Sequence, residues 1–298
     1  MPRTSRHPSL LGRVLTLAGV LVSAALLAPP GAANATSPTC GTLTLHKANG
    51  SDWVCTFDDE FTGSTLDLSK WTVQQTATSG YTTGSPGTHV CYMASPNNIS
   101  VANGYLALTV RKESHLVTCG AYSSWITGGT VSTFAHFSQT YGRFEVRAKF
   151  PDVTVAGLQE TLWLWPVNST RYGAQPASGE IDFAESYSQR SNLVVPYIHY
   201  VSAGYDPNVM SSSCTITLSA FHTYTLVWTT TTMTVSIDDK TCLVDTWQPA
   251  APLLAPQPFD QPFFLVLTQA LGLNANAYNP YSTPMPDTTY IDYARIWQ

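Results

Sequence analysis

Three acidic side chains lie close together in the segment GEIDFAESY: Glu180, Asp182 and Glu185. The other residues of the segment are mostly apolar, as in a buried strand. Because side chains alternate between the two faces of a strand, Glu180 and Asp182 share one face and Glu185 would turn to the other. A carboxylate buried without a partner is costly. We therefore predict a β-bulge near Phe183–Ala184 that returns Glu185 to the face of the other two acids.

The predicted row of acids favours one kind of chemistry. Like charges this close repel one another, so at least one pKa should rise. Glycoside hydrolysis with retention needs one ionised carboxylate to attack the anomeric carbon and one protonated carboxyl to protonate the leaving oxygen. The alternative is a surface acidic cluster or a calcium site, because carboxylates also bind hard cations. Three acids on one strand face enclose a cation poorly, so catalysis is the preferred hypothesis.

The rest of the chain must supply the sheet that carries these acids. Residues 141–150 alternate apolar and charged side chains, and residues 223–238 have the composition of a β-hairpin. Turn signals such as Asn103-Gly104 separate the apolar runs. The sequence shows no pattern typical of a long helix, no internal repeat and no low-complexity linker. These features predict an all-β fold, with one antiparallel sandwich formed by residues 36–298.

The first 35 residues have the pattern of a secretion signal. Three arginines are followed by an apolar run from Val14 to Leu27, and Ala33-Asn34-Ala35 offers small residues for cleavage. The run is shorter than the roughly 20 apolar residues that a membrane helix needs. We therefore expect residues 1–35 to be removed, and the mature protein to be secreted, without a membrane anchor and monomeric.

Charge restricts the partners that the mature protein could bind. The chain has 14 Lys and Arg and 19 Asp and Glu, and residues 1–35 contain three of the basic residues and none of the acidic ones, which leaves a net charge of −8. This balance offers no basic patch for nucleic acid and disfavours a strongly anionic polymer. A neutral substrate fits better.

The six cysteines all follow the predicted signal. An even number in an exported chain favours disulfides over a metal site or a catalytic thiol. Six cysteines allow fifteen pairings, so the spacing does not fix the connectivity. We expect sequential neighbours to pair because each pair brackets a local loop or hairpin: Cys40 with Cys55, Cys91 with Cys119, and Cys214 with Cys242.

The acidic segment GEIDFAE resembles the E-x-D-x-x-E signature of family 16 glycoside hydrolases, in its bulged, laminarinase-like form. Other blocks resemble that family in the same order and cover nearly the whole mature chain: residues 57–71, 141–151, 157–166, 221–239 and 290–298. The resemblance implies an antiparallel β-jelly-roll sandwich with a substrate groove across its concave sheet.

The resemblance also implies roles for individual residues. Glu180 would be the nucleophile, Glu185 the general acid and then base, and Asp182 the electrostatic partner of the nucleophile. Trp163 matches a groove tryptophan, and Trp165 shares its strand face, so both rings could stack on pyranose rings of the substrate.

Two further positions carry expectations from the resemblance. His199 resembles a histidine near the catalytic subsite and is expected to contact substrate. Asp292 stands where some members hold a structural calcium on the convex side. No cofactor is required for catalysis.

The predicted activity is that of a secreted, retaining endo-β-glycanase on β-1,3-glucan or mixed β-1,3/1,4-glucan. The alternatives are a β-galactan endo-hydrolase and a non-catalytic β-glucan-binding protein. The sequence departs from the family pattern at residues 157–161, at Thr130, and at Thr268 and Gln269. These departures are expected to alter the subsites that bind the polysaccharide and to leave the chemistry untouched.

Overall fold

The computed structural model describes residues 38–190, 192–204 and 213–298, so the predicted secretion signal lies outside the described residues. Pro38–Gln298 forms one compact unit. In these described ranges, no helix is long and apolar enough to cross a membrane. The longest α-helix described, α1 (Thr76–Ser79), has four residues. The three short 3₁₀ helices of the same ranges are η1 (Cys40–Thr42), η2 (Ser188–Arg190) and η3 (Asn274–Asn276).

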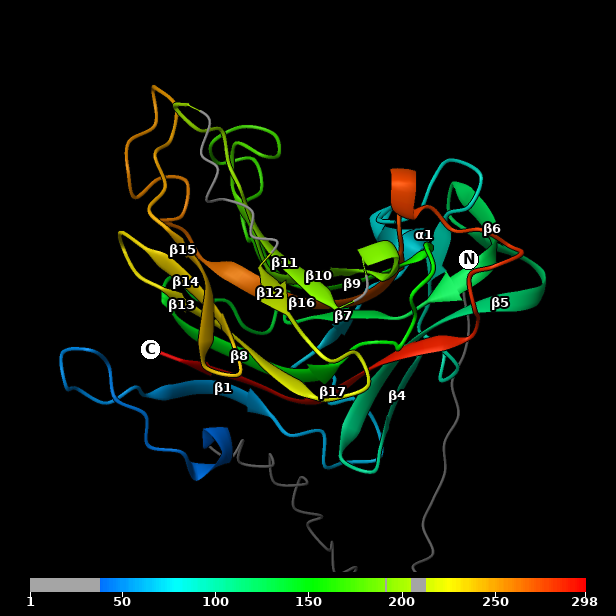
Figure 1. The fold of residues 1–298 in the computed structure, drawn as a ribbon, viewed down its shortest axis with the longest axis horizontal. Coiled ribbons are helices and arrows are strands. Elements are labelled where there is room, and N and C mark those ends of the chain that lie inside the picture. The colour runs from blue at the N-terminus through cyan, green and yellow to red at the C-terminus, as the bar shows by residue number, and fades with distance from the viewer. Residues whose placement is uncertain (1–37, 191, 205–212) are drawn as a thin grey trace, which may run out of the picture. The chain divides into compact units, whose positions relative to one another are not determined.

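Two sheets lie against each other as layers (Figure 1). The ten-stranded sheet has the order β15 (Lys240–Asp245), β14 (Met233–Ile237), β13 (His222–Trp228), β8 (Gly142–Lys149), β17 (Asp287–Trp297), β5 (Tyr105–Cys119), β6 (Tyr122–Gly128) and β3 (Val90–Tyr92). Its remaining strands are β1 (Cys55–Asp59), beside β17, and β4 (Ile99–Ala102), beside β5.

The seven-stranded sheet carries the acidic strand near its middle. Its order is β12 (Cys214–Thr215), β11 (Leu193–His199), β10 (Glu180–Tyr187), β9 (Leu158–Pro166), β16 (Phe263–Leu271), β7 (Thr130–Ser132) and β2 (Thr72–Val73). Every neighbouring pair in this sheet is antiparallel. The predicted all-β sandwich is confirmed.

The core lies between the two sheets and follows the alternation expected from the sequence. On β8, Phe144, Val146 and Ala148 are fully buried. From the facing sheet, Leu162 and Ile181 join the same apolar cluster. Full burial of a side chain of this size contributes about 1.5–3 kcal/mol to folding. The core therefore fixes which face of β9 and β10 turns away from it, and that outer face carries the site.

Two of the three expected disulfides are present, Cys40–Cys55 and Cys91–Cys119. The third expected bond, between Cys214 and Cys242, is not formed in the structure. The two cysteines lie on the edge strands β12 and β15 of opposite sheets. Their thiols nevertheless interact, since a hydrogen bond with Cys214, followed by burial, raises the pKa of Cys242.

Candidate active site

The strand β10 contains the predicted bulge, at Phe183. Its pairing with β9 shifts register between Asp182 and Ala184, and its pairing with β11 shifts between Asp182 and Glu185. Phe183 and Ala184 are both fully buried in the core. Because two consecutive residues face inward, Glu185 returns to the outer face together with Glu180 and Asp182.

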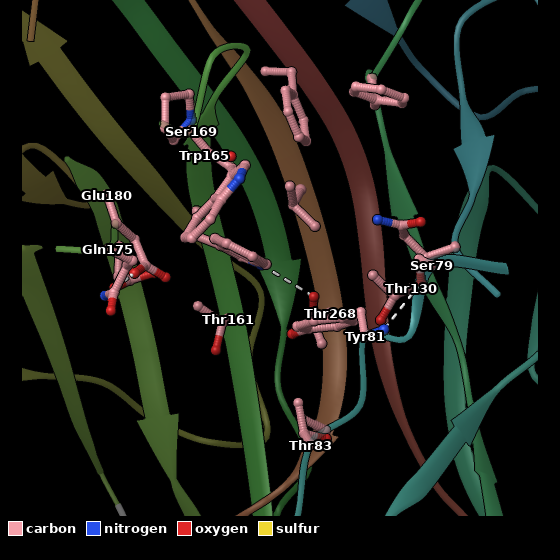
Figure 2. A pocket seen from close by; sticks show the side chains of 18 of the residues that line it. Ser79, Tyr81, Thr83, Thr130, Thr161, Trp165, Ser169, Gln175, Glu180 and Thr268 are labelled. Atoms are coloured by element: carbon pink, nitrogen blue, oxygen red, sulfur yellow. Dashed lines mark hydrogen bonds between the residues drawn. The ribbon is translucent and has the colours of Figure 1, made fainter. Parts of the chain in front are cut away.

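The outer face of the seven-stranded sheet is hollowed by a cleft of about 720 Å³. Glu180, Asp182 and Glu185 all line it. In Figure 2, Glu180 lies beside Gln175 on one wall, and Tyr81 and Thr268 lie together across the cleft. The acids are therefore on the wall of an open groove, where a polymer could reach them.

The turn before β10 sets the position of Glu180. Gly179 has a φ of +83°, and a Cβ there would lie 2.8 Å from Cε1 of Phe259, so this position requires glycine. From the same turn, Nε2 of Gln175 donates a hydrogen bond of 2.8 Å to Oε2 of Glu180. This bond orients the carboxylate that the family resemblance implies as the nucleophile.

The pKa of each acid is raised, mainly by burial, and repulsion between the acids adds to the shift at Glu180 and Asp182. Burial raises the pKa of Glu180 to about 7, with Gln175 opposing and Glu185 supporting the shift. Burial, then Glu185 and Glu180, hold the pKa of Asp182 well above its usual range. The pKa of Glu185 is raised by burial and lowered by hydrogen bonds from Tyr187 and Gln159. Because the three pKa values are raised, the cluster keeps its protons to a higher pH than isolated carboxyls would.

His199 is the partner of Asp182. Its Nε2 lies 3.0 Å from Oδ2 of Asp182, and its ring stacks on Tyr197 with centroids 4.0 Å apart. Burial lowers the pKa of His199 to about 4. Burial of both groups thus favours a neutral pair that shares one proton between Oδ2 and Nε2. The expected substrate contact of His199 stays a prediction, whereas its contact with Asp182 is a feature of the structure.

Glu185 has two hydrogen-bond donors that the sequence did not identify as site residues. Nε2 of Gln159 donates to Oε1 of Glu185 at 2.8 Å, and the hydroxyl of Tyr187 donates to Oε2 at 2.8 Å. The expectation that the departure at Gln159 leaves the chemistry untouched is therefore wrong. Strand alternation could have found both donors, because Gln159 lies four residues before Trp163 and Tyr187 two residues after Glu185.

Aromatic rings line the rest of the cleft. Trp163 and Trp165 both face it, as expected, with ring centroids 5.7 Å apart and planes at 78°. Trp163 donates from Nε1 to Oγ1 of Thr268 at 3.1 Å. Tyr81 lies 6.2 Å from Trp163, between centroids, and comes from the loop after α1. That loop has no strand pattern, so Tyr81 could not be predicted as a cleft residue from the sequence.

The other departures from the family pattern divide into two groups. Thr130 and Thr268 line the cleft, which agrees with an effect on the subsites. Glu160 and Gln269 instead are buried between the sheets, at 2% and 0% exposure, and are hydrogen-bonded to each other at 2.8 Å. The expectation that these two residues alter the subsites is corrected by their position in the core.

Asp292 lies on β17 of the ten-stranded sheet, where it forms an ion pair with Arg147 of β8. The guanidinium group of Arg147 competes with a metal cation for the carboxylate of Asp292. Its positive charge also repels the cation. The residues at Asp292 therefore do not fit a calcium ion. Ligand atoms of Glu180, Asp182 and His199 lie within 4.8 Å of one another, which makes His199 part of the acidic cluster.

The sequence matches a known family of enzymes. The model of the family named Glycosyl hydrolases family 16 matches residues 87–266. The chain belongs to this family. The prediction from the acidic segment is confirmed, and the enzyme class that it implies is glycoside hydrolase.

Three relatives of this family 16 chain are enzymes named for the polysaccharide links that they cleave. The chain is 30% identical over 265 residues to glucan endo-1,3-beta-glucosidase A1 of Niallia circulans, covering 81% of the chain and 37% of the relative. It is 30% identical over 234 residues to endo-1,3-1,4-beta-glycanase ExsH of Rhizobium meliloti (strain 1021), covering 73% and 46%. A keratan-sulfate endo-1,4-beta-galactosidase of Sphingobacterium multivorum is 28% identical over 257 residues, covering 83% and 56%. The chain thus spans less than half the length of the first two relatives.

Solved structures of the family share the fold. LamA of Z. galactanivorans, solved in complex with laminaritriose and laminaritetraose, has 26% sequence identity and a TM-score of 0.69, covering 82% of this chain and 99% of that one. Such laminarinases have the β-jelly-roll fold. The predicted fold class of the family 16 chain is confirmed.

Proposed function

We propose that this family 16 chain is an endo-β-glucanase that hydrolyses internal β-1,3 links, in β-1,3-glucan or mixed β-1,3/1,4-glucan, with retention. The observation that carries the proposal is the bulge at Phe183, which brings Glu180, Asp182 and Glu185 to one wall of an aromatic-lined cleft. The names of the Niallia and Rhizobium relatives and the oligosaccharides bound to LamA support β-glucan as the substrate class.

The reaction proceeds in two displacements. Glu180 attacks the anomeric carbon while Glu185 gives its proton to the leaving oxygen, which leaves a glycosyl ester on Glu180. Glu185, now a carboxylate, takes a proton from water, and the water oxygen displaces the ester and restores Glu180. Asp182, which contacts His199, lies between Glu180 and Glu185 on β10. It is the electrostatic partner of the nucleophile Glu180.

The cleft favours a neutral polymer. Tyr81, Trp163 and Trp165 offer ring faces on which pyranose rings stack. In the described part of the chain, no Lys or Arg is among the residues that line the cleft. A sulfated polymer would need cationic partners for its sulfate groups. The composition of the cleft therefore supports neutral glucan over a sulfated chain.

The proposed function includes secretion as a monomer. The signal pattern of residues 1–35 and the two disulfides Cys40–Cys55 and Cys91–Cys119 support an oxidising, extracellular setting. A glucan polymer is too large to enter a cell intact, so an enzyme that cuts it internally works outside.

A β-galactan endo-hydrolase is the second candidate, and the relative that is a keratan-sulfate endo-1,4-beta-galactosidase favours it. The polar Gln159 in the cleft fits either sugar. A non-catalytic glucan-binding protein is less favoured, because binding alone does not need Glu180, Asp182 and Glu185 together.

Product release from neutral polysaccharides tests the proposal: laminarin, curdlan, lichenan, agarose and unsulfated galactan. The full chain should release oligosaccharides from a β-1,3-glucan, and Glu180→Gln should be inactive while still binding it. Early NMR spectra of the products should show the β-anomer. Release of oligosaccharides from galactan alone would favour the β-galactan endo-hydrolase. Binding of glucan without cleavage by the unmodified protein would favour the non-catalytic binding protein.

A further inference from the structure

The carboxyl of Glu185 has a donor on each of its oxygens. Gln159 donates to Oε1 from β9, and Tyr187 donates to Oε2 from β10, both at 2.8 Å. Gln159 and Tyr187 are directly opposite each other in the β9–β10 ladder, so one cross-strand pair supplies both bonds. Glu185 itself is 8% exposed, so these bonds replace much of the water that it would otherwise contact.

Other titratable groups lie on the elements around Glu185. The titratable groups are Glu180, Asp182 and Tyr187 on β10, His199 on β11, and Arg190 in η2. Burial disfavours a carboxylate at Glu185 and is the largest cause of its raised pKa. Arg190 acts on Tyr187, whose pKa is nevertheless raised by burial and by Glu185. Tyr187 therefore keeps its proton and remains a donor.

The reaction needs Glu185 in both protonation states. Under the proposed function it is an acid in the first displacement and a base in the second. Burial by itself favours the protonated form of Glu185 and opposes its action as a base. Two neutral donors stabilise the carboxylate without adding a charge that would abolish the acid.

We propose that Gln159 and Tyr187 are positioning residues that fix the orientation of the Glu185 carboxyl and stabilise its ionised form. Neither needs to touch the reacting atoms. The inference rests on the proposed function for its catalytic meaning, while the hydrogen bonds themselves belong to the free protein. Its test can therefore be made without a substrate.

The test is an NMR titration of full-length protein labelled with ¹³C at the glutamate carboxyls. The Glu185 signal is assigned by its loss in Glu185→Gln. Gln159→Leu and Tyr187→Phe each remove one donor, so each should move the Glu185 midpoint upward by about one pH unit. Thr161→Val is the matched control. Thr161 lies opposite Glu185 on β9 but is not one of its two donors, so the midpoint of Glu185 should not move in this variant.

A second measurement links the pair to activity. With a β-1,3-glucan as substrate, the alkaline limb of the pH profile of kcat/KM should move to higher pH by the same amount in both variants. Near-ultraviolet circular dichroism checks that both variants fold. Unchanged midpoints in Gln159→Leu and Tyr187→Phe would overturn the inference. A protein that cuts no glucan but shows the two shifts would refute the proposed function and leave the donor pair standing.

Discussion

Glu160 and Gln269 are joined inside the core, where Nε2 of Gln269 donates to Oε1 of Glu160 at 2.8 Å. Oε1 of Gln269 in turn accepts a bond of 2.6 Å from Oγ1 of Thr289. Glu160 and Gln269 belong to the seven-stranded sheet and Thr289 to the ten-stranded sheet, so this chain of bonds links the two layers. Burial raises the pKa of Glu160 to about 8, so it is mostly protonated at neutral pH.

The buried acid makes stability depend on pH. An unfolded Glu160 releases its proton near pH 4.5, whereas the folded one keeps it to about pH 8. Between these values the folded state binds more protons, so the free energy of unfolding falls as pH rises, by up to about 1.4 kcal/mol per pH unit from this group. Glu160→Gln should flatten that slope in urea unfolding measured from pH 5 to 8. An equal slope in both proteins would show that Glu160 is ionised in the fold.

Azide should distinguish the roles of Glu180 and Glu185. Glu185→Ala should lower kcat by about 10²–10⁴-fold on laminarin, because the leaving oxygen loses its acid. With an aryl glycoside, whose leaving group needs no acid, azide should restore turnover and give a β-glycosyl azide. Glu180→Ala with azide should give the α-azide, since azide then attacks in place of the nucleophile. NMR of the products reads the anomer, and the opposite pattern would exchange the two roles.

Trp163 should contribute to binding of the polysaccharide. Trp163→Ala removes a ring face from the cleft and should raise KM for laminarin about tenfold, with a smaller rise for Trp163→Phe. Trp125→Ala is the matched control, because that tryptophan is 50% exposed on β6 and does not line the cleft. Equal KM values for Trp163→Ala and the unmodified protein would remove Trp163 from the binding surface.

The disulfide Cys91–Cys119 should stabilise the wall behind Tyr81. It ties β3 to β5, and Tyr92 of β3 stacks on Tyr81 with centroids 5.3 Å apart. The bond closes a loop of 28 residues, so the double variant Cys91→Ala/Cys119→Ala should lose about 3–4 kcal/mol of unfolding free energy. Urea unfolding measures this loss. A change below about 1 kcal/mol would mean that the reduced chain is already restrained in its unfolded state.

The disulfides show how far cysteine spacing along the chain predicts the pairing. Cys40–Cys55 and Cys91–Cys119 follow from pairing sequential neighbours, and both are present. The same reasoning expected Cys214 to pair with Cys242; their thiols are in contact without a disulfide bond between them, but they lie on edge strands of different sheets and not on one local hairpin. Sequence spacing describes a local loop, whereas Cys214 and Cys242 come together because packing places the edge strands of the two sheets next to each other at this point.

The sequence by itself determined the strands, the sandwich and the row of Glu180, Asp182 and Glu185. These features depend on a period of two residues and on the cost of burying a charge, and both are local properties of the chain. The bulge near Phe183 was predictable for the same reason.

Only the tertiary structure decided which residues surround those acids. Gln159 meets Glu185 because β9 pairs with β10 in one register, and Tyr81 reaches the cleft from a loop far along the chain. Glu160 turned out to face Gln269 across a strand pair in the core. Alternation fixes the face of a strand on which a side chain lies, but strand order and register fix its neighbours, and these come from packing across the whole fold.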